Sequence, residues 1–220
     1  MLASSSQHQS LMNHIYSKQR HIYDATRKFY LLGRDQMIMG LRPPNGGSVL
    51  EIGCGTGRNL VVAAGTRRRA RYFGLDISNE MLKSANKLIK QNELQDQIKI
   101  ANADATDFNP QELFGITKFD RIFISYSLSM MPYWKEAVDQ ALIHLSEKGS
   151  LHIVDFGQQS ELPKTFRSIL RGWLKLFHVS PRTDLLEYLS HISQKSNRGM
   201  VFKKPYRDYT TYCVIGPQRN

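Results

Sequence analysis

The sequence has 220 residues and a net charge of +11, from 30 Lys and Arg against 19 Asp and Glu. That length suffices for one domain with a substantial buried core, and the lack of any run of about 18 apolar residues excludes a membrane-spanning helix. The positive charge predicts an acidic partner, either nucleic acid or the anionic face of a membrane.

The two cysteines, Cys54 and Cys213, are far apart in the sequence. Two such thiols do not make a disulfide scaffold, and no cluster of Cys and His at ligand spacing predicts a metal site. The opening residues MLASSSQHQS lack the apolar stretch of a secretory signal. We therefore expect a cytoplasmic protein with free thiols and no metal.

The elements alternate between helix and strand along most of the chain. Residues 11 to about 41 contain no proline and are predicted to form one long helix, which RPPNGGS at 42–48 ends. Strands are predicted at residues 48–52, 71–78, 98–104, 119–128 and 149–156, with helices near 58–64, 79–92 and 136–145. This alternation predicts parallel βαβ units and hence a three-layer α/β sandwich.

The C-terminal part is predicted to add further elements. A helical insertion is expected at about 160–195, followed by a strand pair around MVFKKPYRDYTTYCVIG. We expect residues 1–47 to form an N-terminal helical cap and residues 48–220 to form the main domain.

The segment VLEIGCGTGRN (Val49–Asn59) places three glycines within five residues. A dinucleotide fingerprint, G-x-G-x-x-G, requires a third glycine where this chain has Arg58, and the Gly-Lys-Ser/Thr of a P-loop is absent. Glycines permit positive φ and let a ligand lie against bare backbone. Glu51, ahead of the loop, would repel a phosphate but suits a cationic group. The loop therefore indicates a ligand without phosphate.

Two acids at the ends of the next strands define that ligand further. Asp76 ends the second strand, 19 residues after Gly57, where a carboxylate can accept both hydroxyls of a ribose. Asp104 ends the third strand and can accept from an adenine amino group. A ligand with adenine, ribose, an amine and a positive centre but no phosphate is S-adenosylmethionine.

The motifs EIGCGTG, GLDIS and NADA resemble the first three motifs of the class I S-adenosylmethionine-dependent methyltransferases, over about residues 48–156. This resemblance implies a Rossmann-like sandwich with a mostly parallel seven-stranded sheet. It also implies that Gly53 and Gly55 lie under the methionine part, Ile77 against adenine, and Ala105 with Asp104 at the adenine edge. The predicted cofactor-binding residues are Arg34, Glu51, Gly53, Gly55, Thr56, Gly57, Asp76, Ile77, Asp104, Ala105 and Ser125.

The N-terminal helix carries two seven-residue repeats, which keep each set on one helix face. They are Tyr16, Tyr23 and Tyr30, and Arg20, Arg27 and Arg34. One interpretation is a packed aromatic face with a solvated basic stripe. The other is a lid that sets tyrosines beside a cationic centre and Arg34 toward a carboxylate. On the second interpretation, Tyr16, Tyr23 and Tyr126 line the methyl-transfer site, and Ser125 and Tyr126 face the methyl group.

The sequence LPKTFRSILRGWLKLFHV at 162–179 predicts an amphipathic helix. Its basic face has no acid among Lys164, Arg167, Arg171 and Lys175, and its apolar side chains include Trp173 and Phe177. Such a pattern is typical of a helix that lies in a membrane interface. A helix docked on the sheet with its basic side in water fits the same pattern.

Four segments, RHIYDATRKFYLLGRD, FDRIFISYSLSMMP, LHIVDFGQQ and FHVSPRTDL, resemble the bacterial betaine-lipid N-methyltransferases. The resemblance implies three methyl transfers to the amino group of diacylglyceryl homoserine, which give diacylglyceryl trimethylhomoserine and S-adenosylhomocysteine. It implies a separate enzyme that supplies the homoserine lipid. We therefore expect a peripheral membrane enzyme whose partners are a lipid amine and an anionic membrane surface.

Three alternatives remain open. Phosphatidylethanolamine N-methyltransferases perform the same chemistry on another head group. A nucleic-acid methyltransferase suits the charge, but SYSLSMMPYW follows the fourth strand where enzymes acting on base amines commonly have Asn/Asp-Pro-Pro-Tyr. We therefore expect no nucleic-acid partner. A scaffold that binds the cofactor without turnover is the third alternative.

Overall fold

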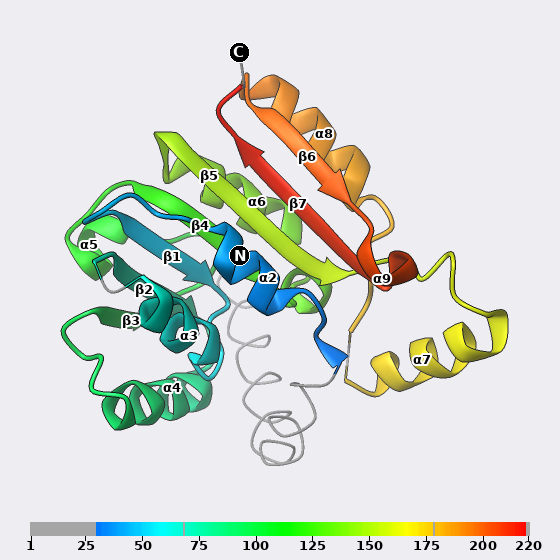
Figure 1. The fold of residues 1–220 in the computed structure, drawn as a ribbon, viewed down its shortest axis with the longest axis horizontal. Coiled ribbons are helices and arrows are strands. Elements are labelled where there is room, and N and C mark those ends of the chain that lie inside the picture. Colours follow the sequence, from blue (N-terminus) through cyan, green and yellow to red (C-terminus); the bar gives the residue numbers. More distant parts are fainter. Residues whose placement is uncertain (1–29, 68, 178, 219–220) are drawn as a thin grey trace.

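The computed structural model describes residues 30–67, 69–177 and 179–218. One twisted sheet runs through the molecule with helices on both faces (Figure 1). Its strand order is β3-β2-β1-β4-β5-β7-β6. The strands are β1 (Ser48–Ile52), β2 (Arg71–Asp76), β3 (Ile98–Asn102), β4 (Phe119–Ser125), β5 (Leu145–Phe156), β6 (Gly199–Lys203) and β7 (Thr210–Gly216). The predicted Rossmann-like sandwich with a seven-stranded sheet is confirmed.

The register of the parallel strands brings their carboxyl ends to one edge of the sheet. Ile52 of β1 lies opposite Leu75 of β2 and Ile124 of β4. The end of β2, at Asp76, lies opposite Asn102 of β3. Of the seven strands, β7 runs antiparallel to both of its neighbours, β5 and β6. The loops that follow β1 to β4 therefore gather at one place, which is where ligands bind in such sheets.

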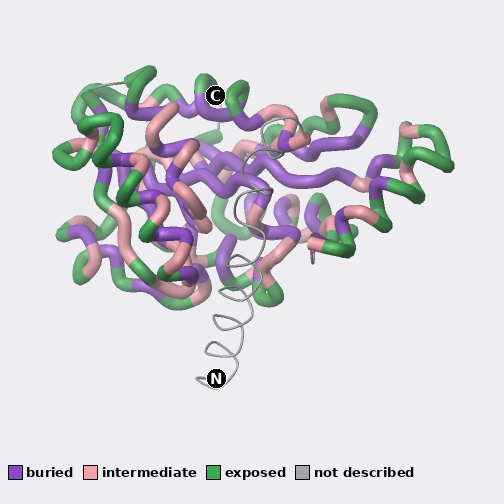
Figure 2. Tube along the Cα trace, turned by 90° about the horizontal axis from the view of Figure 1, so that it is seen from below, coloured by how far each residue is buried: buried purple, intermediate pink, exposed green. Residues whose placement is uncertain are grey.

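Two apolar clusters fill the space between the sheet and its helices, and the strands form the buried centre of the trace in Figure 2. One face is covered by α2 (Arg34–Gly40), α3 (Arg58–Thr66) and α4 (Asn79–Gln91). The other is covered by α5 (Pro110–Phe114), α6 (Trp134–Ile143) and α8 (Leu185–Lys195). The remaining helices are η1 (Leu128–Met130), α7 (Lys164–Leu176) and α9 (Pro205–Asp208). Figure 1 shows α7 set apart from the helices that cover the sheet.

The predicted helix over residues 11–41 is not continuous in its described part. A turn at residues 31–33 precedes α2. Gly33, the N-cap of α2, has a φ of 81°, in the left-handed region that favours glycine. The prediction treated the absence of proline as continuity and overlooked this glycine. The predicted cap residues before 30 lie outside the described residues.

Other element boundaries also differ from the prediction. The third strand ends at Asn102, so Asp104 lies two residues beyond it. The fifth strand begins earlier, at Leu145, because this residue already pairs with Phe119. The helical insertion forms two helices, α7 and α8, separated by a segment that contains Pro181, which has no backbone N–H for a continuous helix. Within the described ranges, no helix is long and apolar enough to span a membrane.

Candidate active site

The glycine loop between β1 and α3 depends on glycine for both conformation and space. Gly53, Gly55 and Gly57 have φ values of 71°, 52° and 74°. A Cβ atom on Gly53 would lie 2.8 Å from Oγ of Ser127, and one on Gly57 would lie 3.0 Å from Cβ of Ala85. The loop therefore presents backbone without side chains at the carboxyl end of β1, as a close-lying ligand requires.

Asp76 holds this loop in place. Its Oδ2 accepts a hydrogen bond from the N–H of Gly55 at 2.8 Å, and its Oδ1 accepts one from the N–H of Ser78 at 2.9 Å. Ser78 caps α4, because its Oγ accepts from the N–H of Met81. The carboxylate is thus oriented at the end of β2. Since each carboxylate oxygen has two acceptor positions, it can also accept from ribose hydroxyls, as predicted.

The backbone at Ile77, the residue predicted to lie against adenine, is held by an amide that the sequence analysis missed. Nδ2 of Asn102 donates to the carbonyl oxygens of Asp76 at 3.1 Å and of Ile77 at 2.9 Å. These bonds join the end of β3 to the turn after β2. The available signal was a polar residue at the end of a predicted strand, where carboxyl-end loops meet.

Asp104 begins a turn after β3. Its Oδ1 accepts from the N–H of Thr106 at 2.9 Å and from its Oγ1 at 2.8 Å. This is an Asx-type turn, in which the carboxylate replaces a backbone acceptor. Ala105 is buried in the cluster beneath. The turn keeps Asp104 and Ala105 near the end of β3, as the predicted adenine edge requires.

Glu51 is almost fully buried beside the loop. Its Oε1 accepts from Nδ2 of Asn59 at 2.8 Å, and its Oε2 has no hydrogen-bond partner within the described ranges. Burial raises the pKa of Glu51 to about 8, while the Asn59 hydrogen bond and the charge of Arg34 oppose the rise. A buried acceptor oxygen without such a partner fits a ligand that brings a positive donor, such as the amine of S-adenosylmethionine.

Arg34 and Ser125 lie at the same edge. Nε of Arg34 donates to the carbonyl oxygen of Leu31 at 3.3 Å, and the arginine charge opposes the rise that burial causes in the pKa of both Glu51 and Tyr126. Oγ of Ser125, the last residue of β4, is buried and has no hydrogen-bond partner among the residues described. Together with the glycine loop and Glu51, Ser125 fits the polar methionine part of the predicted cofactor, and Arg34 can meet a carboxylate of either the cofactor or the acceptor.

The structure corrects the expected orientation of Tyr126. Its hydroxyl donates to the carbonyl oxygen of Leu32 at 2.6 Å and lies 2.9 Å from Oγ1 of Thr210. The residue has a φ of 53°, and burial raises the pKa of its hydroxyl well above the ordinary value. The hydroxyl therefore connects the segment before α2 to β7 and does not stand open toward a methyl group.

Of the remaining predicted residues, the structure describes Thr56 but not Tyr16 and Tyr23. Thr56 lies in the glycine loop between Gly55 and Gly57 and is partly exposed. Tyr16 and Tyr23 lie outside the described residues, so their place at the methyl-transfer site stays a prediction.

Two residues after β4 were missed by the sequence analysis. Oγ of Ser127 donates to the carbonyl oxygen of Ile52 at 3.3 Å and faces Gly53. The N–H of Ser129 donates to Oδ2 of Asp155 at 3.0 Å, and Asp155 is fully buried with a raised pKa. These bonds fix η1 above the glycine loop. The only local signal for Ser127 and Ser129 was the SYSLS pattern after β4. Their hydrogen bonds join segments that are distant in the sequence, so the pattern could not predict them.

Aromatic side chains form a row, here called the aromatic row, from the end of β4 to α7. It consists of Tyr126, Phe156, Tyr209, Tyr30 and Trp173. The ring centroid of Phe156 lies 4.7 Å from Tyr126, 6.0 Å from Tyr209 and 6.5 Å from Tyr30. Tyr30 in turn lies 4.7 Å from Trp173, edge to face. The carboxyl end of the sheet is thus bordered by rings next to Arg34.

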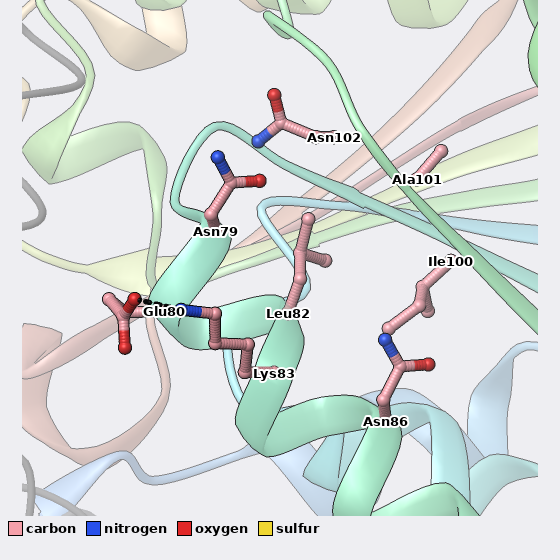
Figure 3. Close-up of a pocket in the computed structure, with 8 residues that line it drawn as sticks. All are labelled: Asn79, Glu80, Leu82, Lys83, Asn86, Ile100, Ala101 and Asn102. Carbon is pink, nitrogen blue, oxygen red and sulfur yellow. Dashed lines mark hydrogen bonds and ion pairs between the residues drawn. The ribbon is translucent and has the colours of Figure 1, made fainter.

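A separate groove of about 530 Å³ lies between α4 and the edge strand β3 (Figure 3). It is lined by Asn79, Glu80, Leu82, Lys83, Asn86, Ile100, Ala101 and Asn102. None of the predicted cofactor residues lines it. The groove therefore lies beside the candidate site and shares with it only the support that Asn102 gives to Ile77.

Comparison with known proteins agrees with this geometry. The chain is 25% identical over 187 residues to the demethylmenaquinone methyltransferase of Lactobacillus johnsonii, covering 79% of this chain and 73% of that protein. The structure is similar to the plantazolicin methyltransferase BpumL in complex with S-adenosylhomocysteine, with a TM-score of 0.68, 15% identity, and 99% and 100% of the two chains covered. It is also similar to a putative methyltransferase in complex with the Haloferax volcanii Trm112 activator, with a TM-score of 0.70, 13% identity, and 94% and 99% covered.

The family itself follows from a match to a family model. Residues 44–203 match the model of the family described as "Methyltransferase domain". This range holds the glycine loop, Asp76, Asp104 and the end of β4. The chain therefore belongs to the methyltransferase domain family and is an S-adenosylmethionine-dependent methyltransferase.

Proposed function

We propose that the enzyme transfers three methyl groups to the amino nitrogen of diacylglyceryl homoserine and so makes the betaine lipid diacylglyceryl trimethylhomoserine. The observation that carries this proposal is the aromatic row, which begins at the carboxyl end of β4 and reaches the amphipathic helix α7. A lipid amine needs both features: rings near the nitrogen and an apolar surface near the acyl chains.

The rings of the aromatic row suit the charge of the product. Successive methylation of an amine ends in a quaternary ammonium ion, which cannot donate a hydrogen bond. Aromatic faces attract such a cation through their quadrupole, by about 0.5–2 kcal/mol for each well-placed ring. Phe156 and Tyr209 are buried beside Tyr126, so an ammonium ion near them would be shielded from water.

The position of Arg34 favours a substrate whose head group carries a carboxylate. The guanidinium of Arg34 lies close enough to Glu51 and Tyr126 to oppose the rise that burial causes in the pKa of both. A guanidinium binds a carboxylate through parallel hydrogen bonds. Homoserine has a carboxylate that ethanolamine lacks, so this placement favours the homoserine lipid.

The chain's own residues then bind and orient the reactants. The glycine loop, Asp76 and Asp104 hold the cofactor, which when bound supplies a methyl group on a positively charged sulfur. The protein must present the neutral amine about 3 Å from that methyl carbon, in line with the bond to sulfur. The amine gives up one proton to solvent before each transfer, and the quaternary ammonium ion formed in the third transfer has no proton left to lose. The homoserine lipid itself would come from a separate enzyme at the cytoplasmic membrane surface.

A second candidate substrate is demethylmenaquinone, after the name of the relative from Lactobacillus johnsonii. That quinone has no amino-acid head group, so its methylation would not require a protein cation that binds a substrate carboxylate. Loss of Arg34 should therefore affect the two reactions differently.

Initial rates with methyl-labelled cofactor test the proposal. The acceptors are diacylglyceryl homoserine, phosphatidylethanolamine and demethylmenaquinone, each dispersed in detergent. We expect label in the homoserine lipid, and a rate at least tenfold lower for Arg34→Ala. The matched control is Arg71→Ala, an exposed arginine at the amino end of β2. Equal rates on the homoserine and ethanolamine lipids would remove the carboxylate argument, and label only in the quinone would replace the substrate.

A further inference from the structure

Helix α7 exposes a set of large apolar side chains, here called the α7 apolar face. It consists of Phe166, Ile169 and Leu176, whose exposed fractions are 53%, 73% and 71%. At helical spacing these three residues lie within about 80° of one another around the helix axis. Exposed apolar residues that gather in this way mark an interaction surface.

The helix is attached to the domain by an adjoining side and by Trp173, which at helical spacing lies between Phe166 and Ile169 around the axis but packs on Tyr30. Leu170 and Leu174 are buried in the core cluster. The ring of Trp173 contacts Tyr30 at 4.7 Å and Phe177 at 4.9 Å. Trp173 and Phe177, which the sequence placed on the apolar face of an interfacial helix, thus belong to the attachment. The free apolar surface is the α7 apolar face.

The charges of α7 indicate what covers this face. The helix carries Lys164, Arg167, Arg171 and Lys175 and no acidic residue. Arg171 is held by the domain, because its Nε donates to Oε1 of Gln159 at 3.2 Å and its Nη2 donates to the carbonyl oxygen of Gln158. The other three cations are partly or fully exposed. At helical spacing Arg167, Lys164 and Lys175 lie about 100–180° from Phe166, on the side opposite Ile169 and Leu176. A basic polar side opposite an exposed apolar stripe is typical of a helix that lies in the interface of an anionic bilayer.

We propose that α7 docks the enzyme on an anionic bilayer by inserting Phe166, Ile169 and Leu176 into the interface. This inference deepens the proposed function, on which its purpose rests. The aromatic row then connects the docked helix directly to the end of β4 through Trp173 and Tyr30. Docking would hold the carboxyl edge of the sheet at the depth where a lipid amine lies.

Vesicle co-sedimentation tests the inference without any acceptor lipid. The vesicles contain phosphatidylglycerol and phosphatidylcholine. Ile169→Ser with Leu176→Ser should weaken binding at least tenfold, which equals about 1.4 kcal/mol. The matched control is Met39→Ser with Ile143→Ser, two exposed apolar residues on α2 and α6. An equal loss in both double variants, or no loss in either, would overturn the role of the α7 apolar face.

The basic residues have their own test. Lys164→Gln with Lys175→Gln should weaken binding to the same vesicles by about 25-fold, since each basic residue near an anionic leaflet contributes about fivefold. Binding to vesicles of phosphatidylcholine alone should be weak for every variant. Tight binding there, unchanged by salt, would contradict an anionic partner.

Two further measurements separate this inference from its rivals. Activity on detergent-dispersed diacylglyceryl homoserine tests the proposed function and should survive Ile169→Ser with Leu176→Ser. Loss of vesicle binding with that activity retained supports docking. Light scattering should show that the wild type does not self-associate. Self-association that Ile169→Ser with Leu176→Ser abolishes would assign the α7 apolar face to a second copy of the chain and overturn the inference.

Discussion

The carboxylate of Asp76 accepts a hydrogen bond from the N–H of Gly55 at 2.8 Å, across the gap between β2 and the glycine loop. One side chain thereby fixes the loop and faces the predicted ribose position. Because its other oxygen accepts from Ser78, the carboxylate cannot rotate without breaking a bond. We therefore expect cofactor binding and loop stability to depend on the same residue.

Asp76→Ala should weaken binding of S-adenosylmethionine by at least tenfold and lower the free energy of unfolding by about 1–3 kcal/mol. It removes a charged acceptor from two backbone donors, each a charge-assisted bond. Calorimetric titration and urea unfolding measure the two effects. Asp96→Ala, which removes an exposed carboxylate before β3, is the control. Unchanged cofactor affinity in Asp76→Ala would disprove the assigned role.

Two glycines with the same φ allow strain and crowding to be separated. Gly53 has a φ of 71° and its Cβ position lies 2.8 Å from Ser127, whereas Gly46 has a φ of 73° and nothing within 4 Å. Gly46→Ala should lower the free energy of unfolding by about 1–2 kcal/mol through left-handed strain alone. Gly53→Ala should cost more and should also weaken cofactor binding. If Gly53→Ala and Gly46→Ala had equal effects on stability and on cofactor binding, the loop would have room for a side chain at position 53.

Glu51 should make the cofactor-free protein less stable as the pH rises from about 4.5 to 8. The folded carboxyl has a pKa of about 8 and the ordinary value is 4.5, so between these values the folded state holds one more proton than the unfolded state. Stability falls where the folded state binds more protons, here by up to about 5 kcal/mol, and is level above pH 8.

The comparison variant for this prediction is Glu51→Gln, which has no proton to lose. Urea unfolding at pH 5, 6.5 and 8 should show a smaller decrease for the variant, with the two proteins diverging most at pH 8. Asp155, whose pKa burial also raises, acts in both proteins and cancels in the difference. If the free energy of unfolding had the same dependence on pH in both proteins, Glu51 would be ionised in the folded state and the prediction would be wrong.

Tyr126→Phe should lower stability by about 1–2 kcal/mol while changing kcat less than threefold. The substitution keeps the ring that packs on Phe156 and removes the bonds to Leu32 and Thr210. A buried carbonyl then loses its donor, which accounts for the destabilisation. Thermal unfolding and steady-state rates give the two numbers. A hundredfold fall in kcat at normal stability would instead place the hydroxyl in the reaction.

The positions of the predicted cofactor residues in the fold were largely predictable because local rules determine them. The glycine loop must follow β1, and the acids must follow β2 and β3, wherever βαβ units repeat. Asp76 and Asp104 were therefore assigned correctly to one edge of the sheet, although β3 ends before Asp104. Glu51 was also expected beside the loop, but its depth of burial and its raised pKa depend on packing that spacing does not reveal.

Contacts between distant parts of the chain could not be predicted in this way. The hydroxyl of Tyr126 reaches Leu32 and Thr210, which are 94 and 84 residues away. Likewise, the periodicity of α7 showed an apolar side but not which part of it would pack on Tyr30. The helix break at Gly33 left a local signal, a glycine within a helical pattern, that was given too little weight.

The most direct test of the account is mass spectrometry of lipids after incubation with S-adenosylmethionine that carries a deuterated methyl group. The enzyme, that cofactor and diacylglyceryl homoserine are combined in anionic vesicles, and the products are followed over time. The account predicts a lipid with three labelled methyl groups on its nitrogen, preceded by the singly and doubly labelled forms. A homoserine lipid that stays unlabelled, while the cofactor is consumed on a quinone, another lipid or RNA, would contradict it.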